Sequence, residues 1–124
     1  MLKSFFIQIQ ASADPNSNLA VSFEDVVSQL EPLPRMFIEW DGSFVWRGET
    51  QEDSTSETLT WQLDGMVYDH LGAVRYVELK GNCPSEPWET LLAILGWPQQ
   101  ELTIHHVNEG RFESLTGFVS HFIS

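Results

Sequence analysis

The chain has 124 residues, a length typical of one folded domain, and 42% of them are hydrophobic, which is enough to build a core. Eighteen acidic residues against six basic ones give a formal net charge of −12, which repels phosphate backbones and anionic lipid headgroups. We therefore expect no nucleic-acid or membrane partner, and a basic protein is the easiest partner to recruit. The lone cysteine, Cys83, excludes an intrachain disulfide, so we expect a cytoplasmic protein.

The N-terminal part predicts a strand followed by a helix. Residues 2–11 alternate between apolar and polar side chains, as a half-buried strand requires. A helix is expected after Ser22, whose hydroxyl can accept a hydrogen bond from the amide of Asp25. The apolar residues of this helix recur at intervals of three and four: Phe23, Val26, Val27 and Leu30. Pro32 and Pro34 end it.

A hairpin is predicted around Asp41-Gly42, between two alternating runs at 35–41 and 43–47. A two-residue loop would scatter the apolar side chains over both faces. A three-residue loop over Asp41–Ser43 gathers them on one face, and we favour this register. The residues so gathered are Met36, Ile38, Trp40, Phe44 and Trp46.

Residues 48–58, GETQEDSTSET, contain no apolar side chain and predict a solvated, mobile acidic loop. The carboxylates of this segment are a candidate acidic docking site for a protein partner: Glu49, Glu52, Asp53 and Glu57. A plain solvated connection is the commoner meaning of such a charge run.

A second hairpin is expected from the alternating run that begins at Leu59, with a bulge at Asp64-Gly65, to a strand over residues 73–80. A second helix should follow, with Ser85 as its cap and Gly96 as its left-handed end. Its apolar residues repeat the helical spacing: Trp88, Leu91, Leu92 and Leu95.

The C-terminal part predicts a strand over residues 101–107 and then a terminal helix from Arg111 onward. The apolar residues on one face of this helix are Phe112, Leu115, Phe118, Val119, Phe122 and Ile123. The expected order is β-α-β-β-β-β-α-β-α. It favours an α+β fold over residues 1–124 as a single domain. We expect a mostly antiparallel or mixed sheet of about six strands, with three amphipathic helices packed on one face.

No metal-binding, cofactor-binding or nucleophile motif is present in the sequence, so we expect neither a cofactor nor a metal. His105 and His106 are neighbours on a strand and must point to opposite faces, which prevents both from binding one ion in a simple way. If the protein is an enzyme, a histidine and a carboxylate must meet through the fold. The candidates for that role are His70, His106, Asp64 and Asp69.

Three tryptophans on the predicted sheet, Trp40, Trp46 and Trp61, are a candidate aromatic platform for a partner. Core packing is the commoner role of such residues, and we favour it. With no catalytic motif, the sequence favours a non-catalytic protein-binding or regulatory module. A small hydrolase-like enzyme and a subunit of a homo-oligomer, such as a homodimer, are the alternatives.

Overall fold

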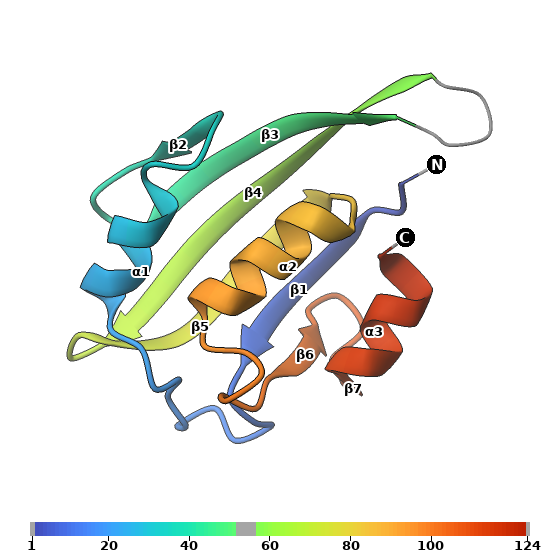
Figure 1. Ribbon diagram of the computed structural model, residues 1–124. Helices are drawn as coiled ribbons and strands as arrows, with labels where there is room; N and C mark the ends of the chain where they lie inside the picture. The colour runs from blue at the N-terminus through green and yellow to red at the C-terminus, as the bar shows by residue number, and fades with distance from the viewer. Residues whose placement is uncertain (1, 52–56, 124) are drawn as a thin grey trace.

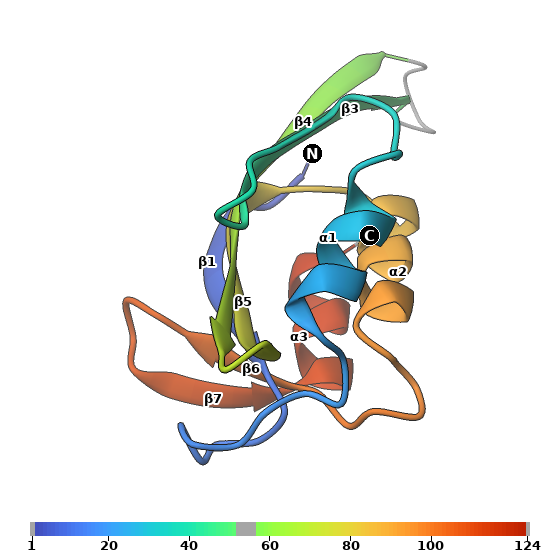
Figure 2. The same cartoon turned by 90° about the vertical axis from the view of Figure 1, so that its left-hand side faces the viewer.

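The computed structural model describes residues 2–51 and 57–123. They form one sheet of seven strands in the order β2-β3-β4-β5-β1-β6-β7, in which every neighbouring pair is antiparallel. The helices all pack on one face of this sheet and leave its other face uncovered (Figure 2). The expected α+β class, antiparallel sheet and one-sided helices are confirmed, with one strand more than expected.

The elements follow one another along the chain as Figure 1 shows. The strands are β1 (Phe5–Gln10), β2 (Met36–Ile38), β3 (Ser43–Gln51), β4 (Thr58–His70), β5 (Ala73–Asn82), β6 (Thr103–His106) and β7 (Arg111–Ser114). The helices are α1 (Phe23–Leu30), α2 (Ser85–Ile94) and α3 (Leu115–Phe122). None of the helices in the described residues has the length and apolar character needed to cross a membrane.

The core lies between the sheet and the helices. Strand β1 contributes Phe5, Ile7 and Ile9 to it, as the alternation of the sequence predicts. Trp88 from α2 and Phe118 from α3 are the largest fully buried side chains, and their rings lie 5.1 Å apart. The buried faces of α2 and α3 are thereby held against the middle of the sheet.

The β2–β3 hairpin has a three-residue loop, but this loop is Trp40–Gly42 rather than Asp41–Ser43. Met36 pairs with Trp46 and Ile38 with Phe44, so the expected common face of these four residues is confirmed. Asp41 determines the loop position, because its carboxylate accepts hydrogen bonds from the backbone N–H and the hydroxyl of Ser43. Trp40 therefore lies in the turn and is 87% exposed.

Strands β3 and β4 are longer than the sequence predicts. Gly48–Gln51, expected in the mobile loop, pairs with Thr58–Trp61 and belongs to β3. The indole of Trp61 lies directly over Gly48, where a Cβ atom would meet the ring at 2.4 Å. An aromatic ring covering a cross-strand glycine compensates for the missing side chain and extends the strand. The expectation of a loop over all of residues 48–58 is therefore wrong for 48–51.

The expected bulge at Asp64-Gly65 is also wrong. Gly65 continues β4 opposite Phe44, whose ring occupies the space that a side chain would take. The irregularity in the pairing of β4 with β5 lies between Tyr68 and Asp69, next to the turn at the end of the hairpin. In both cases an aromatic ring from the neighbouring strand fills the space beside a glycine: Trp61 at Gly48 and Phe44 at Gly65.

The terminal helix begins later than expected, because Arg111–Ser114 forms strand β7. Gly110, with φ at 63°, turns the chain back so that Arg111–Ser114 pairs with Thr103–His106. Ser114 then caps α3 by accepting a hydrogen bond from the N–H of Gly117 at 3.1 Å. Phe112 consequently lies on a strand and not on the helical face predicted for it.

The N-cap residue predicted for α1 is confirmed, whereas the one predicted for α2 is wrong. Ser22 caps α1 as expected and accepts the N–H of Asp25 at 3.1 Å. The expected cap at Ser85 is wrong, because α2 already includes Ser85 and its N-cap residue is Pro84, which makes no side-chain cap bond. Gly96 closes α2 with φ at 99°, as predicted.

Candidate functional site

A groove of about 1110 Å³ lies beside the distal half of the β3–β4 hairpin. Figure 1 shows this half of the hairpin extending past the rest of the sheet. One wall comes from the segment between α1 and β2, and the other from the start of α2. The apolar residues that line the groove are Leu2, Leu33, Pro34, Trp46, Leu59, Trp61, Pro84 and Pro87.

Two tryptophans on adjacent strands give the groove a preformed floor. The rings of Trp46 and Trp61 meet edge to face with their centroids 5.3 Å apart. The indole N–H of Trp46 donates a hydrogen bond to the carbonyl oxygen of Pro34 at 3.1 Å, which ties the floor to one wall. Because Trp46 is 5% and Trp61 8% exposed, the floor is part of the core as well as of the groove.

The groove also reaches the outer edge of β3. Six consecutive residues, Trp46–Gln51, line it. Since neighbouring side chains of a strand point to opposite faces, a hollow on one face would be lined by alternate residues only. The unbroken run therefore places the groove along the edge of the strand that does not pair with β4.

The described residues that line the groove carry charges of both signs in equal number, unlike the chain as a whole. The groove lining includes Arg35, Arg47, Glu49 and Glu86. The guanidinium of Arg35 lies 3.9 Å from the carboxylate of Glu49, and both side chains are more than half exposed. Such a long, solvated contact contributes little stability. Arg35 also has φ at 59°, a backbone conformation that side chains other than glycine seldom adopt.

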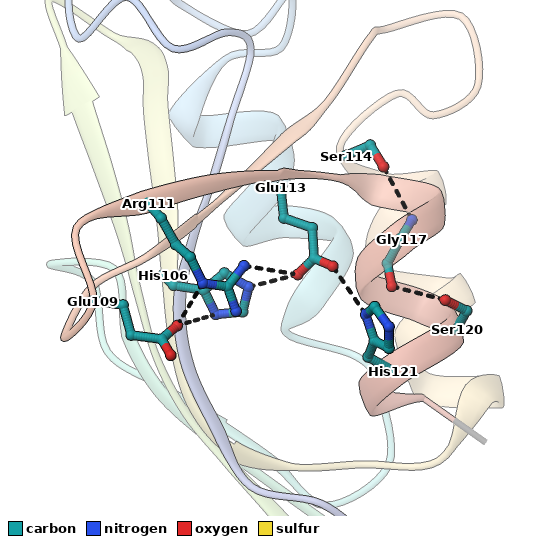
Figure 3. Close-up of polar contacts among 8 residues, drawn as sticks. All are labelled: His106, Glu109, Arg111, Glu113, Ser114, Gly117, Ser120 and His121. Carbon is teal, nitrogen blue, oxygen red and sulfur yellow. Dashed lines mark hydrogen bonds and ion pairs between the residues drawn. The ribbon is translucent and has the colours of Figure 1, made fainter.

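A second cluster of polar side chains is centred on Glu113 (Figure 3). The carboxylate accepts hydrogen bonds from Nε2 of His106 at 2.7 Å and from Nδ1 of His121 at 3.1 Å. The guanidinium of Arg111 lies 3.6 Å away. Arg111 in turn contacts the carboxylate of Glu109 at 2.9 Å. Strands β6 and β7 and helix α3 are joined at this one carboxylate.

Burial by itself would raise the pKa of the Glu113 carboxyl, but the hydrogen bonds from His106 and His121 and the charges of His106 and Arg111 lower it overall. Glu113 is therefore an ionised hydrogen-bond acceptor at neutral pH. No member of this cluster lines the groove, and the described residues contain no group of three or more side chains placed to hold a metal ion. We therefore interpret the cluster as structural: its hydrogen bonds to Glu113 link α3 to the sheet.

The fold does not bring the four expected catalytic candidates together. His106 is buried on the helix side of the sheet, whereas Asp64 lies on the open face, where its carboxylate accepts a hydrogen bond from Gln62. Asp69 accepts the backbone N–H of Gly72 in the β4–β5 turn, beside the exposed His70. None of the four lines the groove.

The true partner of His106, Glu113, was not a candidate in the sequence. Placing residue 113 in a helix conceals the fact that β7 sets it opposite Ile104, on the same face as His106. Two signals for the hairpin were available: Gly110 as a turn residue, and Ser114 as a cap residue directly before the apolar run that begins at Leu115.

The tryptophans do not form one exposed platform. Trp46 and Trp61 are buried toward the helices, in agreement with core packing, and only Trp40 is freely exposed. Of the candidate acidic segment, Glu49 lies on the rim of the groove and Glu57 is an exposed residue just before β4. Glu52 and Asp53 lie outside the described residues.

On the open face of the sheet, polar side chains of β1, β5 and β6 are hydrogen-bonded to one another. Gln8 accepts hydrogen bonds from Gln10 and His105 and donates one to Glu78. Two ring pairs stack on the same face, Tyr68 with Tyr76 and His105 with Phe112. A connected polar ladder of this kind is typical of a sheet face that meets water.

No protein-family model, curated protein or solved structure matches this chain.

Proposed function

We propose that this chain is a non-catalytic protein-binding module whose docking site is the groove along β3. The observation that carries the proposal is the groove itself, where an apolar floor adjoins a strand edge that no described strand pairs with. Binding sites of proteins are typically concave, mostly apolar and largely preformed. The occupant that suits this shape is an extended segment of a partner protein, carrying apolar side chains.

The chemistry of the groove supports binding over catalysis. The described residues that line it include two arginines and two glutamates, and no histidine or cysteine. A general base or nucleophile would need a titratable group near neutral pH beside the bound substrate. The histidines with a carboxylate partner, His106 and His121, are committed to Glu113 at another part of the molecule.

A homodimer through the open sheet face is a weaker proposal. Several polar side chains of that face are hydrogen-bonded to one another, so a second copy would remove water from groups that are already paired. Light scattering coupled to size-exclusion chromatography tests it, and a dimer mass that persists on dilution would favour it.

The groove is tested with a random displayed peptide library selected on the immobilised protein. Peptides that are enriched are then synthesised, and their affinities are measured by fluorescence anisotropy. Thr90 lies on α2 and lines the groove, so Thr90→Arg places a bulky side chain over it. We expect this variant to weaken binding at least about tenfold, the equivalent of one good anchor contact.

Ala93→Arg is the matched control, because Ala93 is exposed on the same helix and does not line the groove. It introduces the same charge into the same element, so electrostatic effects of the added arginine cancel. We expect the control to bind like the wild type. Peptides that bind both variants equally well, or no enrichment above an unrelated acidic protein, would overturn the proposal.

A further inference from the structure

We propose that the partner segment docks as an additional β-strand on the outer edge of β3, at Glu49 and Gln51. This inference rests on the proposed function, because it concerns the same groove. It adds the conformation of the partner, the backbone groups that it pairs with, and the chemistry of its side chains. Strand addition to an exposed edge is a general mode of peptide recognition, in which main-chain hydrogen bonds supply affinity and alternate side chains supply specificity.

The direction of the backbone groups follows from the observed pairing. The N–H of Arg47 points away from β4 and donates to the carbonyl oxygen of Arg35. In an antiparallel strand every second residue directs its N–H and C=O to the same side. Glu49 and Gln51 therefore present their backbone groups to that side too.

No described strand pairs with this part of the edge. Strand β2 contacts β3 only through Met36–Ile38, opposite Phe44–Trp46, and the chain leaves the edge at Arg35. Gly48–Gln51 is paired with β4 on the other side alone. The free edge is thus the direct continuation of the place that β2 occupies, and it opens on the groove.

The length of the edge defines the length of the segment. Each residue of an antiparallel strand advances by about 3.4 Å, so the free edge over Gly48–Gln51 accommodates about four residues of a partner. Alternate side chains of an added strand would point over the apolar floor at Trp61 and Leu59 and out to solvent. A partner segment with apolar residues at every second position matches this pattern.

The charge distribution determines what flanks that segment. Among the described residues, the groove lining carries two arginines and two glutamates, whereas the whole chain carries a formal net charge of −12. A neutral apolar centre with lysine or arginine on both sides therefore complements first the groove and then the surrounding acidic surface. Such flanks also accelerate association at low salt.

The probe is a synthetic peptide, acetyl-Lys-Lys-Val-Thr-Val-Thr-Val-Lys-Lys-amide, titrated into the ¹⁵N-labelled full chain. We expect saturable shifts of the backbone amides of Glu49 and Gln51, and protection of these amides from hydrogen exchange. Methylating the backbone nitrogens of alternate residues along one edge of the peptide should abolish binding. Methylation along the other edge should leave binding intact, because only one edge pairs with β3.

Glu49→Pro and Glu49→Val test the same contact from the side of the protein. Both remove the carboxylate, but only proline removes the outward N–H, and proline is tolerated on an edge strand because that N–H is not part of the β3–β4 ladder. We expect Glu49→Pro to bind the probe at least about tenfold more weakly than Glu49→Val. Similar melting temperatures of the two variants show that the hairpin is intact.

The outcomes separate the two proposals. If both methylated peptide sets, one for each edge, bind as tightly as the parent probe, or if the parent probe does not saturate by about 1 mM, strand addition at β3 is wrong. The proposed function survives that result where library peptides still distinguish Thr90→Arg from Ala93→Arg. If no library peptide makes that distinction, the docking groove fails together with the strand addition. The N-methyl experiment uses the wild-type chain, so it stays decisive even if Glu49→Pro does not fold.

Discussion

Nε2 of His106 lies 2.7 Å from the carboxylate of Glu113, joining a buried residue of β6 to the strand that leads into the terminal helix. The His106 ring is 5% exposed and packs against Phe118 and Phe122 of α3. A polar ring in such a place requires a hydrogen-bond partner, and Glu113 supplies it. A buried polar contact between β6 and β7 therefore lies directly beneath the apolar packing of α3 on the sheet.

Replacing Glu113 with alanine should destabilise the protein by about 2–4 kcal/mol, because His106 loses its acceptor while it stays buried. Urea unfolding followed by circular dichroism measures the change. His121→Ala is the control: it removes the other hydrogen bond to the same carboxylate, but from a side chain that is 68% exposed. We expect it to cost less than about 1 kcal/mol. Equal losses of unfolding free energy in the two variants would contradict the claim that the buried hydrogen bond of His106 matters more than the exposed one of His121.

The contribution of Glu113 should depend on pH. Its pKa in the folded protein is below the ordinary value of 4.5, because the hydrogen bonds from His106 and His121 and the charge of Arg111 outweigh burial. A lowered pKa stabilises the fold above the unfolded-state pKa, and this stabilisation is lost as the pH falls through the folded-state value.

The difference in unfolding free energy between wild type and Glu113→Ala should consequently shrink as the pH is lowered from about 6 to about 3. The groups that face this carboxyl are His106 from β6, Arg111 from β7 and His121 from α3. Glu89→Ala, at an exposed position on α2, is the control and should show no such trend. A difference that stays constant over this range would be inconsistent with a lowered pKa.

Gly48→Ala should disrupt the floor of the groove. A Cβ atom at position 48 would lie 2.4 Å from the Trp61 ring, so the indole must move away from its edge-to-face contact with Trp46. We expect a loss of about 1–3 kcal/mol from overpacking, together with a change in tryptophan fluorescence. Thr60→Ala, on the same hairpin at an exposed position, should change neither signal markedly. An unchanged spectrum for Gly48→Ala would show that Trp61 does not cover the glycine.

Much of the fold could be predicted from local patterns. Alternation identified β1 correctly, and the spacing of apolar residues identified α1 and α2, since a core-facing side dictates these periods. Gly48–Gln51 was mistaken for a loop because the residues that hold it in β3 lie on β4, and polar composition carries no information about pairing. Phe112 was placed in a helix because an apolar residue there fits the helical period by chance.

The candidate site was harder to predict than the fold. The groove consists of residues from β3, β4, the segment after α1 and the start of α2, and only pairing and helix packing bring them together. Trp46 and Trp61 were candidates for an exposed aromatic platform. Whether they face outward depends on which side of the sheet the helices cover, and the sequence alone does not determine that. Glu49 was selected for its charge, whereas its place on a free edge follows from where β2 stops.

The two helix starts at Ser22 and Ser85 should respond differently to alanine. Ser22 accepts the N–H of Asp25, and losing such a cap costs about 1 kcal/mol. Ser85 makes no cap bond at the start of α2, so Ser85→Ala should change stability by less than about 0.5 kcal/mol. Thermal unfolding of both variants measures this contrast. A larger loss for Ser85→Ala than for Ser22→Ala would restore Ser85 as the cap that the sequence suggested.

Cys83 should resist modification as long as the protein is folded. It follows β5 directly in the chain, its side chain is buried, and burial raises the pKa of the thiol to about 12. Only the thiolate reacts with a disulfide reagent, so at pH 8 the thiol is almost entirely in its unreactive, protonated form. We expect an aromatic disulfide reagent to label the native chain slowly, and to label it completely within minutes in urea.

The same reagent also reports on the groove. Cys83 is followed by Pro84, which lines the groove, so a peptide seated there should slow native-state labelling further by suppressing local opening. Ala93→Arg, which leaves the groove clear, should show the same protection as wild type, and Thr90→Arg should lose it. Rapid native labelling at pH 8 would show that the thiol is accessible. Protection that is equal in both variants would place the bound peptide elsewhere on the molecule.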